Sequence, residues 1–189
     1  MLSVIIATDE SERALVPTLA ALVPGATQGA IREVIVADKG SRDQTARVAD
    51  IAGCRLLVTG APLAARLREA AAAARSTWLM FLRPGIVPDL TWVAETLRFL
   101  DEAELSGQSD ARAAVFSPAT GTARPALALV ATLFGCRPRP DQGLVIAKRL
   151  YDSLGGHRDG GADCEVDLLR RLGGRRIVTL RTGAARANT

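Results

Sequence analysis

Continuous runs of apolar residues stand out in the first half of the chain, at residues 2–8, 33–37, 55–59 and 78–82. Because their apolar residues are consecutive rather than alternating, these runs are typical of strands buried on both faces of a sheet. Between the runs the apolar residues recur at helical spacing, as Leu15, Leu19 and Leu22 do. The alternation of strand and helix predicts an α/β fold, a three-layer α/β/α sandwich with a mostly parallel central sheet.

The second half of the chain has a less regular pattern. Strands are predicted at residues 113–117, 143–147 and 176–180, and a helix is predicted at residues 163–172. Residues 182–189 have no apolar pattern and are expected to form a tail. The length of 189 residues fits one domain, which we divide into halves at residues 1–104 and 105–181.

One apolar stretch, residues 125–134, falls outside this pattern. It is too short to span a bilayer. A core helix or a surface for self-association is expected there, and the alternative is contact with a membrane surface. The chain begins with a strand-like run and no basic region or cleavage site, so a cytoplasmic location is expected, at most peripheral to the inner face of the membrane.

The composition excludes several classes of protein. Hydrophobic residues make up 48% and charged residues 23%, an ordinary globular balance that excludes global disorder. Cys54, Cys136 and Cys164 match no zinc spacing, and the single His157 cannot form a cluster of histidine ligands. A zinc hydrolase or a serine hydrolase is therefore not predicted.

The net charge of +4 comes almost entirely from arginine, since Lys39 and Lys148 are the only lysines. Arginine suits bidentate contacts to phosphate, but a biased composition is the favoured explanation for its abundance. The arginines are scattered and aromatic residues are only 4% of the chain, so a nucleic acid is not predicted as a partner.

Ligands of parallel α/β sheets bind outside the carboxyl ends of the strands. The residues that follow the four predicted strands are 8–10, 38–41, 60–62 and 83–85. The first of these segments has no glycine, which argues against the glycine-rich phosphate loop of a Rossmann-type enzyme.

These strand ends, taken in order, resemble the family 2 glycosyltransferases of the GT-A fold, in their short single-domain bacterial branch. Residues 3–8 look like the opening strand, and residues 33–45 look like the second strand with its Asp-x-Gly-Ser-x-Asp-x-Thr turn. Residues 141–143, 154–156 and 165–172 resemble the half that faces the acceptor. The resemblance implies a nucleoside-diphosphate sugar as donor, an acceptor that the sequence does not identify, and a nucleotide-binding half at residues 1–104.

The same resemblance assigns the nucleotide-binding residues. Thr8 matches the strand end that lines the nucleoside pocket, and Asp38 matches the aspartate that accepts hydrogen bonds from the base. Ser41 lies in the same turn, while Glu10 stands where many relatives have asparagine and adds negative charge beside the expected diphosphate. The alternative is that Asp38 and Ser41 only shape the turn and cap the next helix.

The end of the fourth strand departs from the family. An Asp-x-Asp or His-x-Asp motif is expected there, whose last aspartate holds Mn²⁺ or Mg²⁺, but the sequence reads Arg83-Pro84-Gly85. No metal ligand is therefore predicted, and Asp89 is expected to cap the following helix. Either Arg83 replaces the metal as a fixed cation, with help from Arg66 and Arg68, or the chain is a catalytically inactive binding or scaffold protein.

The family's catalytic base also differs. Inverting members use the aspartate of a Glu-Asp pair, and here the pair reads Cys164-Glu165. Glu165 is the candidate base and Asp167 the reserve, although charge at a helix N-terminus explains Glu165 equally well. Asp141 and Gln142 are expected to line the acceptor side or, alternatively, to form a turn.

Overall fold

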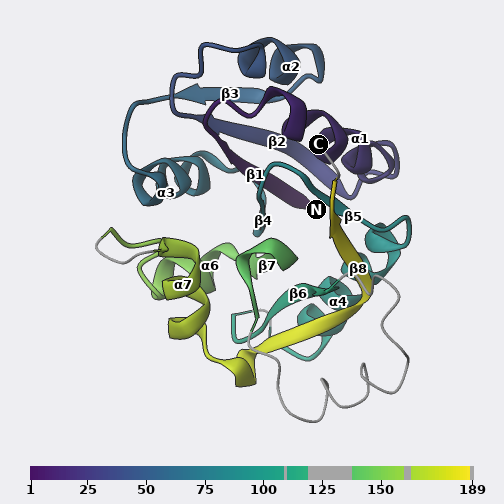
Figure 1. Ribbon diagram of the computed structural model, residues 1–189. Coiled ribbons are helices and arrows are strands. Elements are labelled where there is room, and N and C mark those ends of the chain that lie inside the picture. Colours follow the sequence, from purple (N-terminus) through teal and green to yellow (C-terminus); the bar gives the residue numbers. More distant parts are fainter. Residues whose placement is uncertain (109, 119–137, 160–162, 188–189) are drawn as a thin grey trace.

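The computed structural model describes residues 1–108, 110–118, 138–159 and 163–187. In this part of the chain eight strands form one sheet, in the order β3-β2-β1-β4-β7-β6-β8-β5 (Figure 1). The strands are β1 (Leu2–Thr8), β2 (Ile31–Asp38), β3 (Arg55–Val58), β4 (Trp78–Leu82), β5 (Ile86–Pro88), β6 (Ala113–Pro118), β7 (Leu144–Ala147) and β8 (Ile177–Arg186).

Six α-helices and two short 3₁₀ turns are seen in the same residues. They are α1 (Glu12–Thr27), α2 (Thr45–Ile51), α3 (Leu63–Ala73), α4 (Trp92–Leu105), α6 (Lys148–Ser153) and α7 (Cys164–Leu172), with η1 (Pro140–Gln142) and η2 (Gly174–Arg176). The apolar stretch 125–134 lies outside the described residues, so the expectations for it stay predictions.

The first half of the chain folds as its apolar runs predict. Strand β1 pairs in parallel with β2 and with β4, and β2 pairs in parallel with β3. Helices α1 and α2 lie on one side of these strands and α3 on the other (Figure 1). The predicted α/β fold is confirmed, and the carboxyl ends of the parallel strands meet at one edge of the sheet.

The second half adds antiparallel pairs to this sheet. Strand β7 runs antiparallel to β4 and β6, with Phe81 opposite Leu144. Buried hydrophobic side chains from both halves form one continuous core. Among the most enclosed is Trp92 of α4, whose indole N–H donates to the carbonyl of Ala21 at 3.0 Å and so ties α4 to α1.

The last strand is longer than the sequence predicts. Strand β8 continues to Arg186, through the residues expected to form a tail, because Gly183 and Ala184 pair with β6 and Arg186 pairs with Ile86 of β5. Asp89 does not cap α4. Its carboxylate instead accepts a hydrogen bond from the backbone N–H of Gly183 at 3.0 Å and fixes β8.

Candidate functional site

A cavity of about 850 Å³ lies at the carboxyl ends of β1 and β4. This volume is within the range of small-molecule sites. Its walls come from the ends of β1 and β4, the loop before α3, and single residues of α7 and β8. They include Thr8, Glu10, Lys39, Arg66, Arg83, Glu165 and Arg186. This cavity therefore lies at the strand ends, where a ligand site was expected from the sequence.

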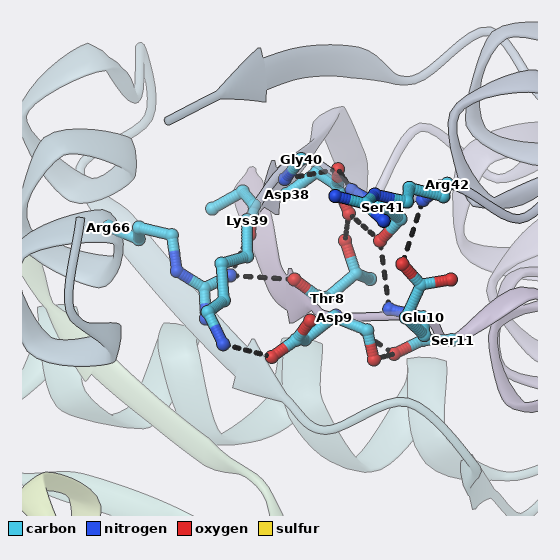
Figure 2. A network of polar contacts seen from close by, with 11 residues as sticks. Thr8, Asp9, Glu10, Ser11, Asp38, Lys39, Gly40, Ser41, Arg42 and Arg66 are labelled. Atoms are coloured by element: carbon cyan, nitrogen blue, oxygen red, sulfur yellow. Dashed lines mark hydrogen bonds and ion pairs between the residues drawn. The ribbon is translucent and has the colours of Figure 1, made fainter. Parts of the chain in front are cut away.

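Asp38 lies outside this lining and organises the loop after β2 (Figure 2). Its Oδ1 accepts from the hydroxyls of Thr8 at 2.7 Å and Ser41 at 2.6 Å, and its Oδ2 accepts from the amides of Gly40 and Ser41. Burial alone would raise the pKa of Asp38, but these hydrogen bonds hold it below its ordinary value. Four donors fill the carboxylate, as the turn-forming alternative predicts.

Glu10 closes the same loop from the β1 side. Its carboxylate oxygens accept from the backbone amides of Arg42 at 2.8 Å and Asp43 at 3.1 Å, and its own amide donates to the Ser41 hydroxyl. Glu10 has a φ of 49°, in the left-handed region that non-glycine residues seldom adopt. The cost of this backbone conformation is offset by the three hydrogen bonds, and the negative charge is directed toward the loop amides.

Arg66 enters the floor of the cavity from α3 and is only 5% exposed. Its Nη1 donates to the carbonyls of Thr8 and Ala37, each at 2.7 Å, and Figure 2 shows the first of these contacts. Its Nε has no hydrogen-bond partner among the described residues. Burial lowers the pKa of Arg66, and the nearby carboxylates of Asp9 and Asp38 oppose that shift. Arg66 is thus a rigid buried cation.

Arg68, which was expected to assist Arg83, has another role. Its guanidinium donates to the carbonyl of His157 at 2.5 Å and to the carboxylate of Asp159 at 2.8 Å, and it does not line the cavity. Arg68 therefore holds the loop that precedes α7.

Arg83 extends from the end of β4 to two carboxylates at the start of α7. Its Nε donates to Glu165 at 2.6 Å and its Nη2 donates to Asp163 at 2.7 Å. Asp163 also caps α7, since its Oδ1 accepts from the amides of Glu165 and Val166. Asp163 is not among the site residues predicted from the sequence, although an aspartate one residue before a helix is a recognised capping signal.

The two carboxylates respond differently to this arrangement. Burial raises the pKa of Glu165 more than the hydrogen bond and charge of Arg83 lower it. For Asp163 burial acts in the same direction, but Arg83 and the helix amides outweigh it, and its pKa is lowered. Glu165 is thus the more basic carboxylate and the one that lines the cavity. Asp167, the reserve base, is outside the cavity and pairs with Arg171 at 2.8 Å.

The residues at the end of β4 do not fit the metal that the fold family implies. Arg83-Pro84-Gly85 has no side-chain oxygen, and the two nearest carboxylates bind a guanidinium. Gly85 is structural: its φ is 86°, its amide donates to the carbonyl of Ala14, and its carbonyl accepts from Ala187. Within the described ranges no group of three histidine, cysteine, aspartate or glutamate residues is placed to hold a metal ion.

The expected acceptor-side pair lies away from the large cavity. Gln142 is buried, and its side chain accepts from the amide of Arg139 at 2.8 Å and donates to the carbonyl of Phe116 at 2.7 Å. Asp141 is exposed. Their neighbours Pro140 and Gly143 line a separate cavity of about 10 Å³ beside Glu165, room for about one water molecule.

His157 completes this small cavity and was given no role by the sequence. Its Nδ1 lies 2.9 Å from the hydroxyl of Tyr151, and its ring packs edge-on against Phe81 with 4.9 Å between ring centroids. Burial, reinforced by the positive charges of Arg171 and Arg68, lowers the pKa of His157 to about 4. The imidazole is therefore neutral at pH 7 and acts as a packed polar residue of the core.

Comparison with known proteins identifies the fold. No protein-family model and no curated protein sequence matches the chain. Among solved structures, glucosyl-3-phosphoglycerate synthase from Mycobacterium tuberculosis, in complex with Mn²⁺, UDP and glucosyl-3-phosphoglycerate, matches with a TM-score of 0.70 at 23% identity. That match covers 100% of this chain and 72% of the synthase chain.

A second solved structure, TarS residues 1–349 from S. aureus, matches with a TM-score of 0.73 at 15% identity, over 98% of this chain and 60% of TarS. At these identities the matches establish the fold, which is that of GT-A glycosyltransferases, and not the activity. In the described part of the chain no helix has the length and apolar character needed to cross a membrane.

Proposed function

We propose that this chain is a GT-A-type glycosyltransferase that binds a nucleoside-diphosphate sugar and transfers the sugar to an acceptor, without the family's usual metal motif. The observation that supports it most is the cavity of about 850 Å³ at the strand ends, which brings together a basic carboxylate and several guanidinium groups. The similar M. tuberculosis synthase was solved with UDP-glucose and Mn²⁺. This supports a nucleotide sugar as the class of donor.

Glu165 is the proposed general base. Its carboxylate lines the cavity, and burial raises its pKa, so it takes up a proton more readily than an exposed glutamate would. In the reaction, Glu165 removes the proton of an acceptor hydroxyl while that oxygen forms a bond to the anomeric carbon. The bond from this carbon to the diphosphate oxygen breaks, and its electron pair leaves with the nucleoside diphosphate. Attack from the face opposite the leaving group inverts the anomeric centre.

The chain's own residues also suggest how the leaving diphosphate is stabilised. Preorganised cations act on charge that develops in the transition state, and those lining the cavity are guanidinium groups and one lysine. Arg83 donates to Glu165 through Nε and to Asp163 through Nη2, and its Nη1 makes no hydrogen bond to a described residue. Arg83 thus has one nitrogen left for a ligand, while Thr8 and Arg66 contribute to the floor of the nucleoside end.

A second candidate function is supported by the same ion pairs. Arg83 and Glu165 neutralise each other, and the oxygens of Asp38 are already filled by donors from its own loop. The alternative is a catalytically inactive protein that binds a nucleotide on this fold, as a sensor or scaffold. Such a protein does not need the side chains of Arg83, Glu165 and Asp38 to be free for catalysis. Under this alternative the cavity takes up a ligand and releases it unchanged.

The test is an assay of sugar transfer and donor hydrolysis with UDP- and GDP-sugars, run together with calorimetric titration of UDP and GDP. Transfer by the wild type, reduced about 100-fold or more by Glu165→Gln, supports the glycosyltransferase. Glu69→Gln, an exposed glutamate of α3, is the matched control and should leave the rate unchanged. Nucleotide binding without turnover supports the inactive alternative, and absence of binding contradicts both.

A further inference from the structure

The charged groups around the large cavity are mostly paired with one another. Lys39 binds Asp9 at 2.7 Å, as Figure 2 shows. Arg83 is shared between Asp163 and Glu165, so this cluster of one cation and two carboxylates has a formal charge of −1 when both are ionised. With the charge of Arg83 balanced by these carboxylates, the cluster adds no net attraction for an incoming phosphate. Arg83 alone therefore does not explain how the cavity would hold an anion.

Two guanidinium groups of the lining have no carboxylate partner among the described residues, Arg66 and Arg186. Arg66 is fixed on two backbone carbonyls at the floor of the cavity. Arg186 is exposed at the rim, and no hydrogen bond or ion pair of its side chain is made to the described part of the chain. These two residues hold the positive charge that remains available to a ligand.

The backbone places Arg186 at this rim firmly. Arg186 pairs with Ile86 in the antiparallel ladder of β5 and β8, and the amide of the next residue, Ala187, donates to the carbonyl of Gly85 at 2.7 Å. Figure 1 shows the end of β8 beside β5 and near α1. Through Gly85, the residue that follows β8 is attached to the segment that follows Arg83.

We infer that Arg186 binds the phosphate-bearing part of the ligand and supplies the positive charge that the Arg83 cluster lacks. This inference rests on the proposed function, since it assumes that the cavity receives a phosphorylated ligand. A guanidinium presents a planar fork of donors that matches phosphate oxygens, and a position at the rim leaves that fork free to adjust. The phosphate is that of the donor's diphosphate or of a phosphorylated acceptor, and both offer the same chemistry.

The experiment compares the wild type with Arg186→Gln and Arg186→Lys by calorimetry at fixed salt. The control is Arg181→Gln, an exposed arginine of the same strand that does not line the cavity. The probes are uridine, UDP, GDP, inorganic pyrophosphate and glycerol 3-phosphate. We expect Arg186→Gln to weaken UDP or GDP binding about 10- to 100-fold, with uridine unaffected and Arg186→Lys intermediate. The control should bind all probes as the wild type does.

The outcomes separate this inference from the proposed function. If glycerol 3-phosphate loses affinity and UDP does not, Arg186 still binds a phosphate, but that of the acceptor. If pyrophosphate is the only probe that binds and Arg186→Gln abolishes its binding, the inference stands and a nucleotide donor does not. Unchanged affinity of Arg186→Gln for a ligand that the wild type binds overturns the inference and leaves the proposed function intact. A wild type that binds none of the probes overturns both.

Discussion

Arg83 lies at the end of β4, where the resemblance to glycosyltransferases predicts a metal-binding aspartate, and its guanidinium pairs there with two carboxylates. Its pairing with Asp163 and Glu165 crosses about eighty residues of sequence. Burial of Arg83 opposes its charge, but the two carboxylates prevail and its pKa is raised further. Arg83 therefore stays charged at every working pH. The position of Glu165 relative to the cavity depends on this contact.

His157 should make the protein less stable in mild acid. Its pKa is about 4 in the folded chain and near its ordinary 6.5 in the unfolded chain, so between these values the unfolded state binds more protons. The contribution of the neutral imidazole to the free energy of unfolding is thus fully present above pH 6.5, and it is lost as the pH falls toward 4. From pH 7 to pH 5 this loss is about 2 kcal/mol. Urea unfolding at both pH values measures it.

The variant His157→Gln retains a side chain that can bond to Tyr151 but cannot take up a proton in this range. Its free energy of unfolding should fall less between pH 7 and pH 5 than that of the wild type. The charged groups around the imidazole are Arg171, Arg68, Asp163 and Asp167, and they are the same in both proteins. An equal fall in the two proteins would show that His157 does not carry the effect.

At the scale of elements, the last strand connects stability to the site. The carboxylate of Asp89 accepts a hydrogen bond from the backbone N–H of Gly183, and the backbone N–H of Asp89 donates to the Gly183 carbonyl at 2.9 Å. Replacing Asp89 by alanine leaves that amide without its acceptor, and we expect a loss of about 1–2 kcal/mol in the free energy of unfolding. Because β8 also positions Arg186, nucleotide affinity should fall in the same variant. Urea unfolding and UDP titration measure the two effects.

Asp101→Ala, an exposed aspartate of α4, is the control for this variant and should change neither quantity. If Asp89→Ala lowers stability while UDP affinity is unchanged, β8 stabilises the sheet without contributing to the site. Hydrogen exchange at Gly183 would then show whether the strand end has loosened at all.

The elements also show what a sequence pattern can and cannot predict. Continuous apolar runs predict β1 and β4 with the bounds that are observed, since a strand covered on both faces favours apolar residues on both of its sides. Strand β5 was missed because it is only three residues long. The end of β8 was missed because its inward residues, Thr182 and Ala184, are small or polar and their alternation is weakly apolar.

The sequence predicted the position of the cavity better than the contacts around it. The strand ends do surround the cavity, because topology alone fixes where parallel strands terminate. The pairing of Arg83 with Glu165 and the filling of Asp38 by its own loop depend on side-chain geometry that spacing along the chain does not encode. Arg186 had no signal at all, since residues 182–189 were expected to form a tail. Candidate residues could be proposed, but which of them remain free for a ligand could not.

At the scale of the whole molecule, the two halves of the chain meet at the Arg83 cluster, and this leads to a prediction about metal. Since the guanidinium of Arg83 already binds both carboxylates, UDP binding by the wild type should be the same in EDTA and in Mn²⁺.

Substituting Arg83→Asp removes the cation and places a third carboxylate beside Asp163 and Glu165, a donor set that suits Mn²⁺ or Mg²⁺. UDP binding by this variant should be weak in EDTA and recover with Mn²⁺. Arg83→Gln, which adds no carboxylate, should bind weakly in both. Wild-type binding that requires Mn²⁺, or an Arg83→Asp variant that ignores it, would contradict a site organised around arginine.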